Sequence, residues 1–448
     1  MPQGRDVTSP QLIFGLDDQP SFGKTLLAAM AHLFAIVASI LTAPLLIARA
    51  VGLDSASTQY VISASLVVSG IATLIQTYRI GIVGSGLLAV QGTSFAFIGT
   101  MAYAAAQLPP ATPQDELLGY LLGTAAVGGV MVVVLSFFLD TVRKVITPTV
   151  TGVTICLLGL SLLWSALNNS WRLLGSASAG DTPLLAFEWI FTLLTIALLA
   201  TRQNLYARLI CVPAGLFAGL LLAAMLRGWD MPAAQLDQPL FFLELLPVSL
   251  KFSPVALMIL LPIFLVSLTE TIGDITATSL VSKQPIEGKA YFHRLRGGVL
   301  GDGFNTVLAS FFGAFPNTTF SQNNAVIRLT GIASRQVGYV LALLLIALGS
   351  IPAVSSLVVT IPGSVLNATT AFLFALIAYT GLGIVRNHAQ SRGIRVLVIS
   401  VSGAFGLIFA PQLLLAVGIE IHAYAAILMG FPVASGTIMA IVADKLVA

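Results

Sequence analysis

Charged residues are scarce in this chain, and their scarcity decides its class. Only 9% of the 448 residues are Asp, Glu, Lys or Arg, against about 25% in an ordinary soluble domain. A soluble protein of this length needs more charge to cover its surface. Here 57% of the residues are hydrophobic and the mean hydropathy is +0.96. The sequence therefore excludes a soluble globular protein and predicts one whose main solvent is lipid.

Several motifs are also missing, and each absence argues against a class of function. The two cysteines, Cys156 and Cys211, lie in apolar stretches, which argues against a disulfide or a metal pair. No HExxH, P-loop or GxGxxG pattern occurs, so we expect no metal, no cofactor and no ATP-driven step. The net charge of +3 comes from scattered basic residues, which argues against nucleic acid as a partner. The polar stretch 1–22 lacks the pattern of a cleaved signal peptide, so the first apolar segment is expected to stay in the membrane.

Long apolar runs fill the rest of the chain. A hydrocarbon core of about 30 Å takes about 20 helical residues to cross. The runs between polar breaks predict an all-α membrane protein with fourteen spans, near 25–47, 58–77, 83–106, 116–139, 144–166, 184–201, 207–226, 253–278, 295–314, 317–332, 335–358, 362–384, 393–411 and 421–446.

The basic residues indicate the orientation of these spans. If the N-terminus is cytoplasmic, only Arg49, Arg172, Arg227 and Lys251 of the 21 Lys and Arg residues lie on the outer side. This asymmetry follows the positive-inside rule. We therefore predict a multi-pass protein of the inner membrane with both termini in the cytoplasm.

Fourteen spans divide into two sets of seven near the polar stretch 228–238, and an odd number per set makes the second set inverted. The third and tenth spans share an interruption, 84–95 and 313–323, in which Gly or Pro precedes hydroxyl and amide side chains. Paired interruptions point to a transporter's binding site, because unpaired mid-membrane amides need a cavity or a ligand. The alternative is a packing kink or a contact between small residues. Suitable N-caps for the half-helices that follow are Thr93, Ser94, Thr319 and Ser321.

Three carboxylates, Glu270, Asp274 and Asp302, are predicted inside spans rather than in loops. An ionised Asp at a helix centre costs about 2.5 to 3.5 kcal/mol, so such groups usually face a cavity and carry function. Glu270 and Asp274 are four residues apart and share a helix face, and Gly273 between them is expected to let another backbone approach. Two close carboxylates in a poor dielectric favour proton uptake by one of them, although a purely structural pair is the alternative. A lone His32 in an early span is more often a structural donor than a ligand.

At this point the residues resemble a known family, the nucleobase–ascorbate transporters (nucleobase:cation symporter-2), nearest their bacterial xanthine permeases. The resemblance runs from Leu12 through the eleventh span and weakens toward the C-terminus. Two departures, Ala325 where a Gly is usual and Ala31 where many relatives have a polar residue, leave the exact substrate range open. The most specific stretches are Glu270–Thr278, Gln284–Gly288, Arg296–Leu300 and Gln322–Asn324.

The resemblance implies a core domain that moves against a gate domain, with substrate between the half-helices of spans three and ten. After a cytoplasmic tail, 1–24, the core comprises 25–139 and 251–360. The gate comprises 140–250 and 361–448. Pairing of two chains through their gate domains is also implied.

Residue roles come with the resemblance. Glu270 would accept hydrogen bonds from purine N–H groups, Gln322 would pair with the purine edge, and Phe95 would stack on the ring. The backbone amides of Ser94 and Phe95 would face the substrate, and Asn323 would set affinity and selectivity. The resemblance assigns Asp302 and Asp274 to transport and proton coupling, and His32 to organising the site.

We therefore predict a transporter, not an enzyme: a proton-coupled symporter that imports a purine nucleobase, with xanthine favoured, by alternating access. Its partners are the purine, protons and the bilayer. Urate, hypoxanthine and uracil stay open as cargoes. An anion exchanger is disfavoured because Glu270 and Asp302 would face like charge. An intramembrane aspartyl protease is disfavoured because no Tyr-Asp dipeptide accompanies Gly301-Asp302.

Overall fold

The computed structural model describes residues 12–109, 111–178, 180–228, 240–416 and 422–447. Helices dominate these residues, and two strands of three residues each form a small sheet. The predicted boundary between the repeats, 228–238, falls almost entirely outside the described residues.

The first repeat contains the elements from α1 to α9, with β1 between α2 and α3. Their bounds are α1 (Phe22–Val51), α2 (Ser55–Tyr78), β1 (Gln91–Thr93), α3 (Phe97–Ala106), α4 (Gln114–Leu135), the 3-10 turn η1 (Ser136–Phe138), α5 (Leu139–Val145), α6 (Pro148–Ser176), α7 (Asp181–Ala200), α8 (Leu205–Leu209) and α9 (Cys211–Arg227).

The second repeat contains the elements from α10 to α18, with β2 between α11 and α12. Their bounds are α10 (Pro254–Val281), α11 (Gly288–Phe311), β2 (Asn317–Thr319), α12 (Gln322–Thr330), α13 (Arg335–Gly349), α14 (Pro352–Val359), α15 (Gly363–Leu407), α16 (Ala410–Ala416), α17 (Ala423–Met429) and α18 (Pro432–Leu446).

Membrane-spanning length is reached by many of these helices. Among the described residues, seven are long and apolar enough to cross a bilayer, and two further pairs pass the same test with a bend between their members. One bent pair is α13 and α14, which meet at 70° where Pro352 begins the second helix. The other predicted spans correspond to shorter or more polar elements, including α9, α11 and the interrupted spans three and ten.

Spans three and ten are interrupted as predicted. Each has a short strand followed by a half-helix, β1 before α3 and β2 before α12. The two strands pair antiparallel with Gln91 opposite Thr319 and Thr93 opposite Asn317, so the two repeats meet where spans three and ten are interrupted. This pairing satisfies backbone groups that a broken helix would otherwise leave unpaired.

The predicted caps of the half-helices are only partly as expected. Thr93 and Thr319 lie in the strands, so neither caps a helix. Ser321 occupies the N-cap position of α12 without a side-chain capping bond. The Ser94 hydroxyl accepts a hydrogen bond from the amide of Ala96 at 3.2 Å, one residue before α3 begins.

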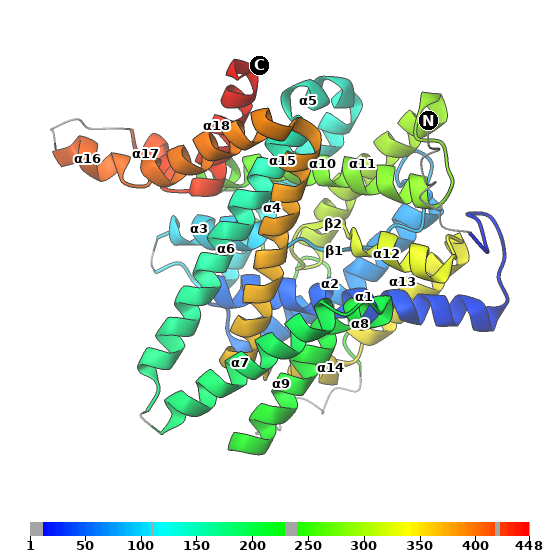
Figure 1. Ribbon diagram of the computed structural model, residues 1–448, viewed down its shortest axis with the longest axis horizontal. Helices are drawn as coiled ribbons and strands as arrows, with labels where there is room; N and C mark the ends of the chain where they lie inside the picture. The colour runs from blue at the N-terminus through cyan, green and yellow to red at the C-terminus, as the bar shows by residue number, and fades with distance from the viewer. Residues whose placement is uncertain (1–11, 110, 179, 229–239, 417–421, 448) are drawn as a thin grey trace, which may run out of the picture.

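A second difference concerns α15, which runs without a break through two predicted spans. The expected loop at 385–392 contains neither proline nor glycine, and nothing in this stretch stops the helix. Helix α15 packs along α6, and α7 and α18 also contact it. Figure 1 shows α6 and α15 side by side, crossing the direction of α1 and α13.

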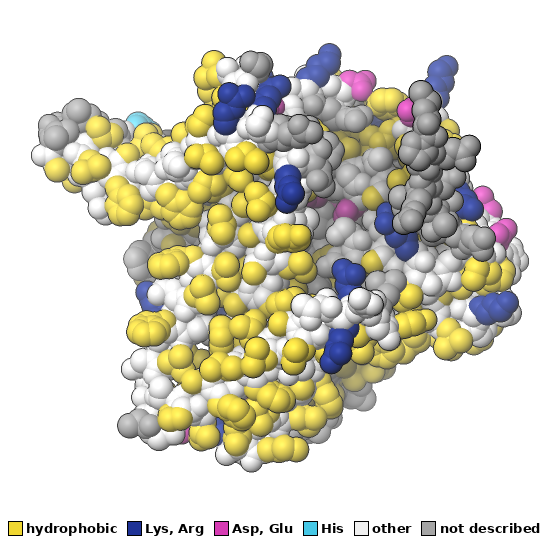
Figure 2. Space-filling model, in the orientation of Figure 1, with side chains coloured by type: hydrophobic (Ala, Val, Ile, Leu, Met, Phe, Trp, Pro, Cys, Tyr) yellow, Lys and Arg dark blue, Asp and Glu magenta, His cyan; other side chains and the backbone are white. Residues whose placement is uncertain are grey.

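The elements before and after this bundle pack mainly with one another. Helix α2 contacts α1 and α13, and α4 contacts α11 and α10. Apolar side chains cover the outer faces of α6, α7 and α9, whereas Lys and Arg gather mostly along the upper and right-hand parts of the view (Figure 2). The apolar outer faces are those expected of a protein that lies in lipid.

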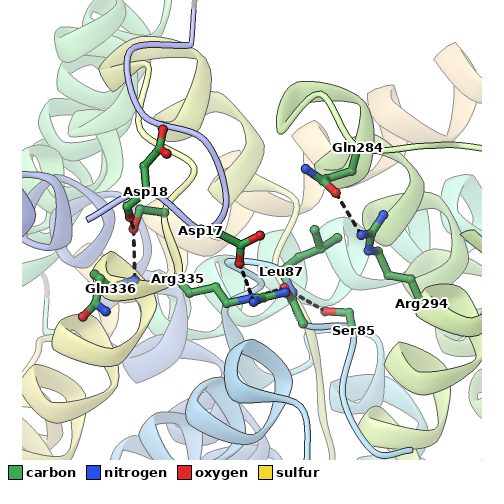
Figure 3. Close-up of polar contacts among 10 residues, drawn as sticks. Asp17, Asp18, Ser85, Leu87, Gln284, Arg294, Arg335 and Gln336 are labelled. Carbon is green, nitrogen blue, oxygen red and sulfur yellow. Dashed lines mark hydrogen bonds and ion pairs between the residues drawn. The ribbon is translucent and has the colours of Figure 1, made fainter. Parts of the chain in front are cut away.

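A segment that we call the N-terminal strap, residues 12–20, lies along the connection between α12 and α13. The amides of Ile13 and Phe14 donate to Gly331 O, and the amide of Arg335 donates to Leu16 O. The Arg335 guanidinium lies 2.6 Å from an oxygen of Asp17 and donates to Gly86 O at 2.7 Å (Figure 3). Arg335 therefore joins the strap to the segment that leads into β1.

Candidate functional site

A cavity of about 730 Å³ lies where α10, the starts of both half-helices, α6 and α15 meet. On one side it is lined by Glu270, Gly273 and Asp274 of α10 and by residues 318–322 around the start of α12. On the opposite side α6 contributes Thr151, Ile155 and Leu158, and α15 contributes Leu376, Ile377, Thr380 and Ile384. The cavity therefore lies between the two groups of helices, and elements of both repeats line it.

Both half-helices begin at this cavity, where Ser94, Phe95, Ala96, Ser321 and Gln322 are among its lining residues. The amides of Phe95 and Ser321 donate no hydrogen bond to another described residue. Helix starts carry partial positive charge and free N–H groups, so they attract acceptor atoms of a ligand. The amide of Ser94, in contrast, donates to Pro316 O at 3.1 Å. Only the Phe95 half of the expected Ser94–Phe95 amide pair is thus free to face a ligand.

Glu270 lies in the wall of the cavity, and its carboxylate has no hydrogen bond or ion pair to another described residue. Asp274, one turn further along α10, also lines the cavity and accepts a hydrogen bond from the Thr319 hydroxyl at 3.1 Å. Their spacing places both on one face, as predicted. Glu270 is only partly buried, but a carboxylate in a cavity wall without a donor from the described residues is stabilised by a partner from the ligand or by a proton.

Asp302 lies behind the cavity wall in α11, with 4% of its surface exposed. One oxygen accepts from the side-chain amides of Gln76 at 2.8 Å and Gln91 at 2.9 Å. The other accepts from the hydroxyls of Thr271 and Thr318. Four donors satisfy this carboxylate, so its contacts are those of a group that positions α2, β1, α10 and β2.

The remaining predicted residues separate into two groups. Gln322 and Phe95 line the cavity, and the Phe95 ring meets that of Phe374 of α15 edge-on at 6.4 Å between centroids. Asn323 and His32 do not line it. Asn323 is buried and donates from its side chain to Leu88 O, and His32 is fully buried in α1 with neither ring nitrogen bonded to a described residue.

Gly273 is placed differently from our expectation. Nothing lies within 4 Å of the position that a methyl group would take there. The glycine therefore widens the cavity beside Glu270 and does not admit another backbone.

Sequence reasoning missed several polar residues of the site. Gln76 donates to Asp302 and to Gly298 O, and it accepts from the amide of Ser85. Thr151 of α6 donates to Thr269 of α10 at 2.9 Å, directly beside Glu270. The available signal was an amide or hydroxyl within an apolar span, which is weak because hydroxyls also bond to their own helix. In the described part of the chain no three His, Cys, Asp or Glu side chains come together to hold a metal ion.

A further acidic residue inside a span was also missed. Glu188 of α7 is fully buried, with its oxygens 2.7 and 2.8 Å from Nε and Nη2 of Arg227 in α9. It also accepts from the Ser364 hydroxyl of α15. Our expectation that only three acidic residues lie inside spans was therefore wrong. This ion pair joins three helices and lies outside the cavity lining.

Comparisons with solved structures support the fold. The transmembrane domain of the cyanobacterial bicarbonate transporter BicA aligns over 97% of this chain and all of its own, with a TM-score of 0.58 and 15% identity. Murine solute carrier 26 family member A9, an anion transporter in the inward-facing state, aligns over 90% of this chain and 69% of its own, with a TM-score of 0.60 and 14% identity. The predicted fold of fourteen segments in two inverted repeats, with core and gate, is confirmed.

Comparisons of sequence place the chain in a family. Xanthine permease XanP of Escherichia coli (strain K12) is 38% identical over 413 residues, 90% of this chain and 88% of that protein. XanQ of the same strain, also a xanthine permease, is 34% identical over 441 residues, 96% of this chain and 92% of its own. The uric acid-xanthine permease of Emericella nidulans is 32% identical over 443 residues, 91% of this chain and 76% of its own. A model of the "Permease family" matches residues 23–414, and the chain belongs to this family of transporters.

Proposed function

We propose that this protein is a proton-coupled symporter that imports a purine nucleobase, with xanthine favoured, by alternating access. The observation that carries the proposal is Glu270, a carboxylate without a protein partner in the wall of a cavity at which two half-helices begin. The xanthine permeases XanP and XanQ, at 38% and 34% identity, favour xanthine as the cargo.

The lining of the cavity matches a flat, polar ring. Glu270 accepts hydrogen bonds from purine N–H groups, and Gln322 supplies both a donor and an acceptor to the purine edge. Phe95 stacks on the ring, and its free amide together with that of Ser321 meets the carbonyl oxygens. Asn323 acts from behind through its bond to Leu88 O, which holds α12 against the segment before β1. His32 packs α1 against the rest of the core and has a positioning role.

The proton binds at Glu270 or Asp274 and not at Asp302. Glu270 and Asp274 face the cavity, one with no protein donor and the other with one. Asp302 has four donors that stabilise its ionised form. Protonation of the Glu270–Asp274 pair removes the like-charge repulsion on one helix face, and purine and proton thereby bind together.

Transport follows from movement of the core, 25–139 and 251–360, against the gate, 140–250 and 361–448. Glu270 and Gln322 belong to the core and travel with it, whereas Thr151 and Thr380 of the gate form the opposite wall. One proton that crosses 100 mV contributes about 2.3 kcal/mol, which supports about fortyfold accumulation at 1.4 kcal/mol per tenfold. We place the protein in the inner membrane with both termini cytoplasmic and, as a further proposal, as a dimer through the gate domains.

Uptake of radiolabelled xanthine in cells that lack their own purine carriers tests the function. We expect uptake that collapses with a protonophore and in Glu270→Gln. Glu244→Gln is the matched control because Glu244 is exposed and lies outside the cavity lining. Unlabelled urate, hypoxanthine and uracil, added as competitors, rank the cargoes.

The competitor order decides among the alternatives. Stronger competition by urate than by xanthine itself would reassign the cargo to urate, which the uric acid-xanthine permease of Emericella nidulans makes the second candidate. Well-expressed protein that takes up none of these compounds would overturn the purine proposal. Uptake of xanthine that survives the protonophore would remove proton coupling alone.

A further inference from the structure

Three arginines gather at one edge of the core. Arg79 directly follows α2, Arg294 lies in the second turn of α11, and Arg335 begins α13. A methyl group at Gly86 would lie 3.4 Å from Arg335 Nη2 and 3.6 Å from Arg79 Cδ. Helix α11 lies against the segment that follows Arg79, because the amide of Gly84 donates at 2.8 Å to the carbonyl of Gly297, three residues beyond Arg294. The three side chains therefore share one small region.

Few acidic side chains of the described residues balance the positive charge of this cluster. Asp17 of the strap pairs with Arg335 at 2.6 Å, but 78% of the Asp17 side chain is exposed. Arg294 donates from Nη2 to the neutral amide oxygen of Gln284 at 3.0 Å, while its Nη1 is buried without a partner among the described residues. The Arg79 side chain makes no hydrogen bond or ion pair with any other described residue. Figure 3 shows the contacts of Arg335 with Asp17 and of Arg294 with Gln284, which lies in the connection between α10 and α11.

Apolar side chains border the cluster. Tyr78, Ile80 and Ile82 are 65%, 57% and 62% exposed on either side of Arg79. Tyr78 lies against Tyr339 of α13, with 6.3 Å between ring centroids. Aromatic and aliphatic groups mixed with arginines are typical of the depth at which headgroups meet acyl chains. Guanidinium groups bind phosphate through paired, charge-assisted hydrogen bonds.

We propose that Arg79, Arg294 and Arg335 form a binding site for the phosphate group of an anionic lipid, at the edge of the core where the N-terminal strap is fastened. Asp17 competes with that phosphate for Arg335. Arg335 also donates a hydrogen bond to Gly86 O. A phosphate bound to Arg335 therefore stabilises the segment that leads into β1 and the transport cavity. Inorganic phosphate has the same chemistry and is the alternative source.

Thermal unfolding of the purified, full-length protein in detergent tests this site. Dioleoylphosphatidylglycerol is titrated against dioleoylphosphatidylcholine and, separately, against inorganic phosphate. We expect phosphatidylglycerol alone to raise the melting temperature. Arg79→Gln and Arg294→Gln should each raise, about fivefold, the lipid concentration that gives half of the maximal rise in melting temperature. This change corresponds to about 1 kcal/mol per arginine near a membrane surface. Arg202→Gln is the control, because Arg202 is exposed between α7 and α8.

One variant separates a lost site from a damaged fold. Asp17→Asn removes the competing carboxylate, so it should lower the lipid concentration for half the shift, a gain that misfolding does not give. An equal response to inorganic phosphate would assign the site to soluble phosphate and overturn the lipid assignment. An unchanged shift in Arg79→Gln and Arg294→Gln, or no gain in Asp17→Asn, would overturn the site itself.

Discussion

The side-chain nitrogen of Gln91 lies 2.9 Å from the carboxylate of Asp302, although 211 residues separate them in the chain. Gln91 begins β1 in the first repeat, and Asp302 lies in α11 of the second. The position of the first half-helix is therefore set by a carboxylate of the other repeat. Asp302 and Glu270 then have different tasks, which single substitutions separate.

Asp302→Asn should lower stability, whereas Glu270→Gln should not. The asparagine keeps the shape but removes the charge, and it replaces one of the two accepting oxygens with an NH2 donor that faces two donors, so we expect a loss of about 1 to 2 kcal/mol. The Glu270 carboxylate bonds to no described residue, so its amide variant should unfold at the wild-type temperature while losing xanthine binding. Thermal unfolding and binding of radiolabelled xanthine by purified protein measure the two effects. Equal melting temperatures for the two variants would contradict the assignment.

Gly273→Ala should leave the fold intact and weaken substrate binding. No atom lies within 4 Å of the added methyl group, which would project into the cavity beside Glu270. We expect an unchanged melting temperature and a raised KM for xanthine uptake. Gly92→Ala is the contrasting variant, because its methyl group would collide with the Phe320 ring and lie 3.0 Å from Ile40 Cγ1. The Gly273 prediction fails if KM stays unchanged or if both variants lose stability alike.

Thr151→Val should change how often the cavity is open. The hydrogen bond from its hydroxyl to Thr269 joins α6 to α10 in the conformation that contains the cavity. Loss of about 1 kcal/mol shifts the equilibrium between this conformation and its alternative about fivefold toward the alternative. Labelling of Thr380→Cys by a maleimide reports cavity access, since Cys156 and Cys211 are buried. We expect slower labelling when Thr151→Val is combined with Thr380→Cys than in Thr380→Cys alone. Thr195→Val is the control, because that hydroxyl bonds within its own helix, and equal rates in both would exclude this role.

Glu188→Gln should destabilise the gate strongly. The Arg227 side chain is 34% exposed, so we expect a loss near 3 kcal/mol, at the low end for a broken buried pair. The double variant, Glu188→Gln with Arg227→Gln, should lose less free energy of unfolding than the sum of the losses in the two single variants. Melting temperatures of the four proteins form the cycle. A strictly additive result would show that the pair contributes nothing as a pair.

Much of the fold and site was predictable from local pattern. The four-residue spacing of Glu270 and Asp274 alone places both on one face, and the interruptions at 84–95 and 313–323 indicate the strand and half-helix pairs. Helix spacing and broken spans are properties of neighbouring residues, and for this reason the sequence carries them directly.

Other features depend on partners that are remote in sequence. Glu188 lies only seven residues from the start of α7, so the sequence alone suggests an acidic residue at the membrane interface. Its burial depends on Arg227 and Ser364, which come from other helices. The amide of Ser94 is unavailable because Pro316, from the other repeat, accepts its hydrogen bond. Whether Gly273 faces a backbone or a cavity likewise depends on what packs opposite, and one sequence does not specify that.

The N-terminal strap also has a consequence for biosynthesis. Asp18 O accepts a hydrogen bond from the hydroxyl of Ser334, which is made 316 residues later. At about 5 to 20 residues per second, the ribosome adds Ser334 about 15 to 60 s after Asp18. The β1–β2 pair has a similar delay, because Gln91 must wait for Thr319. The first repeat is therefore inserted into the bilayer long before the ribosome makes β2, which completes its strand pair, and Ser334, which bonds to the N-terminal strap.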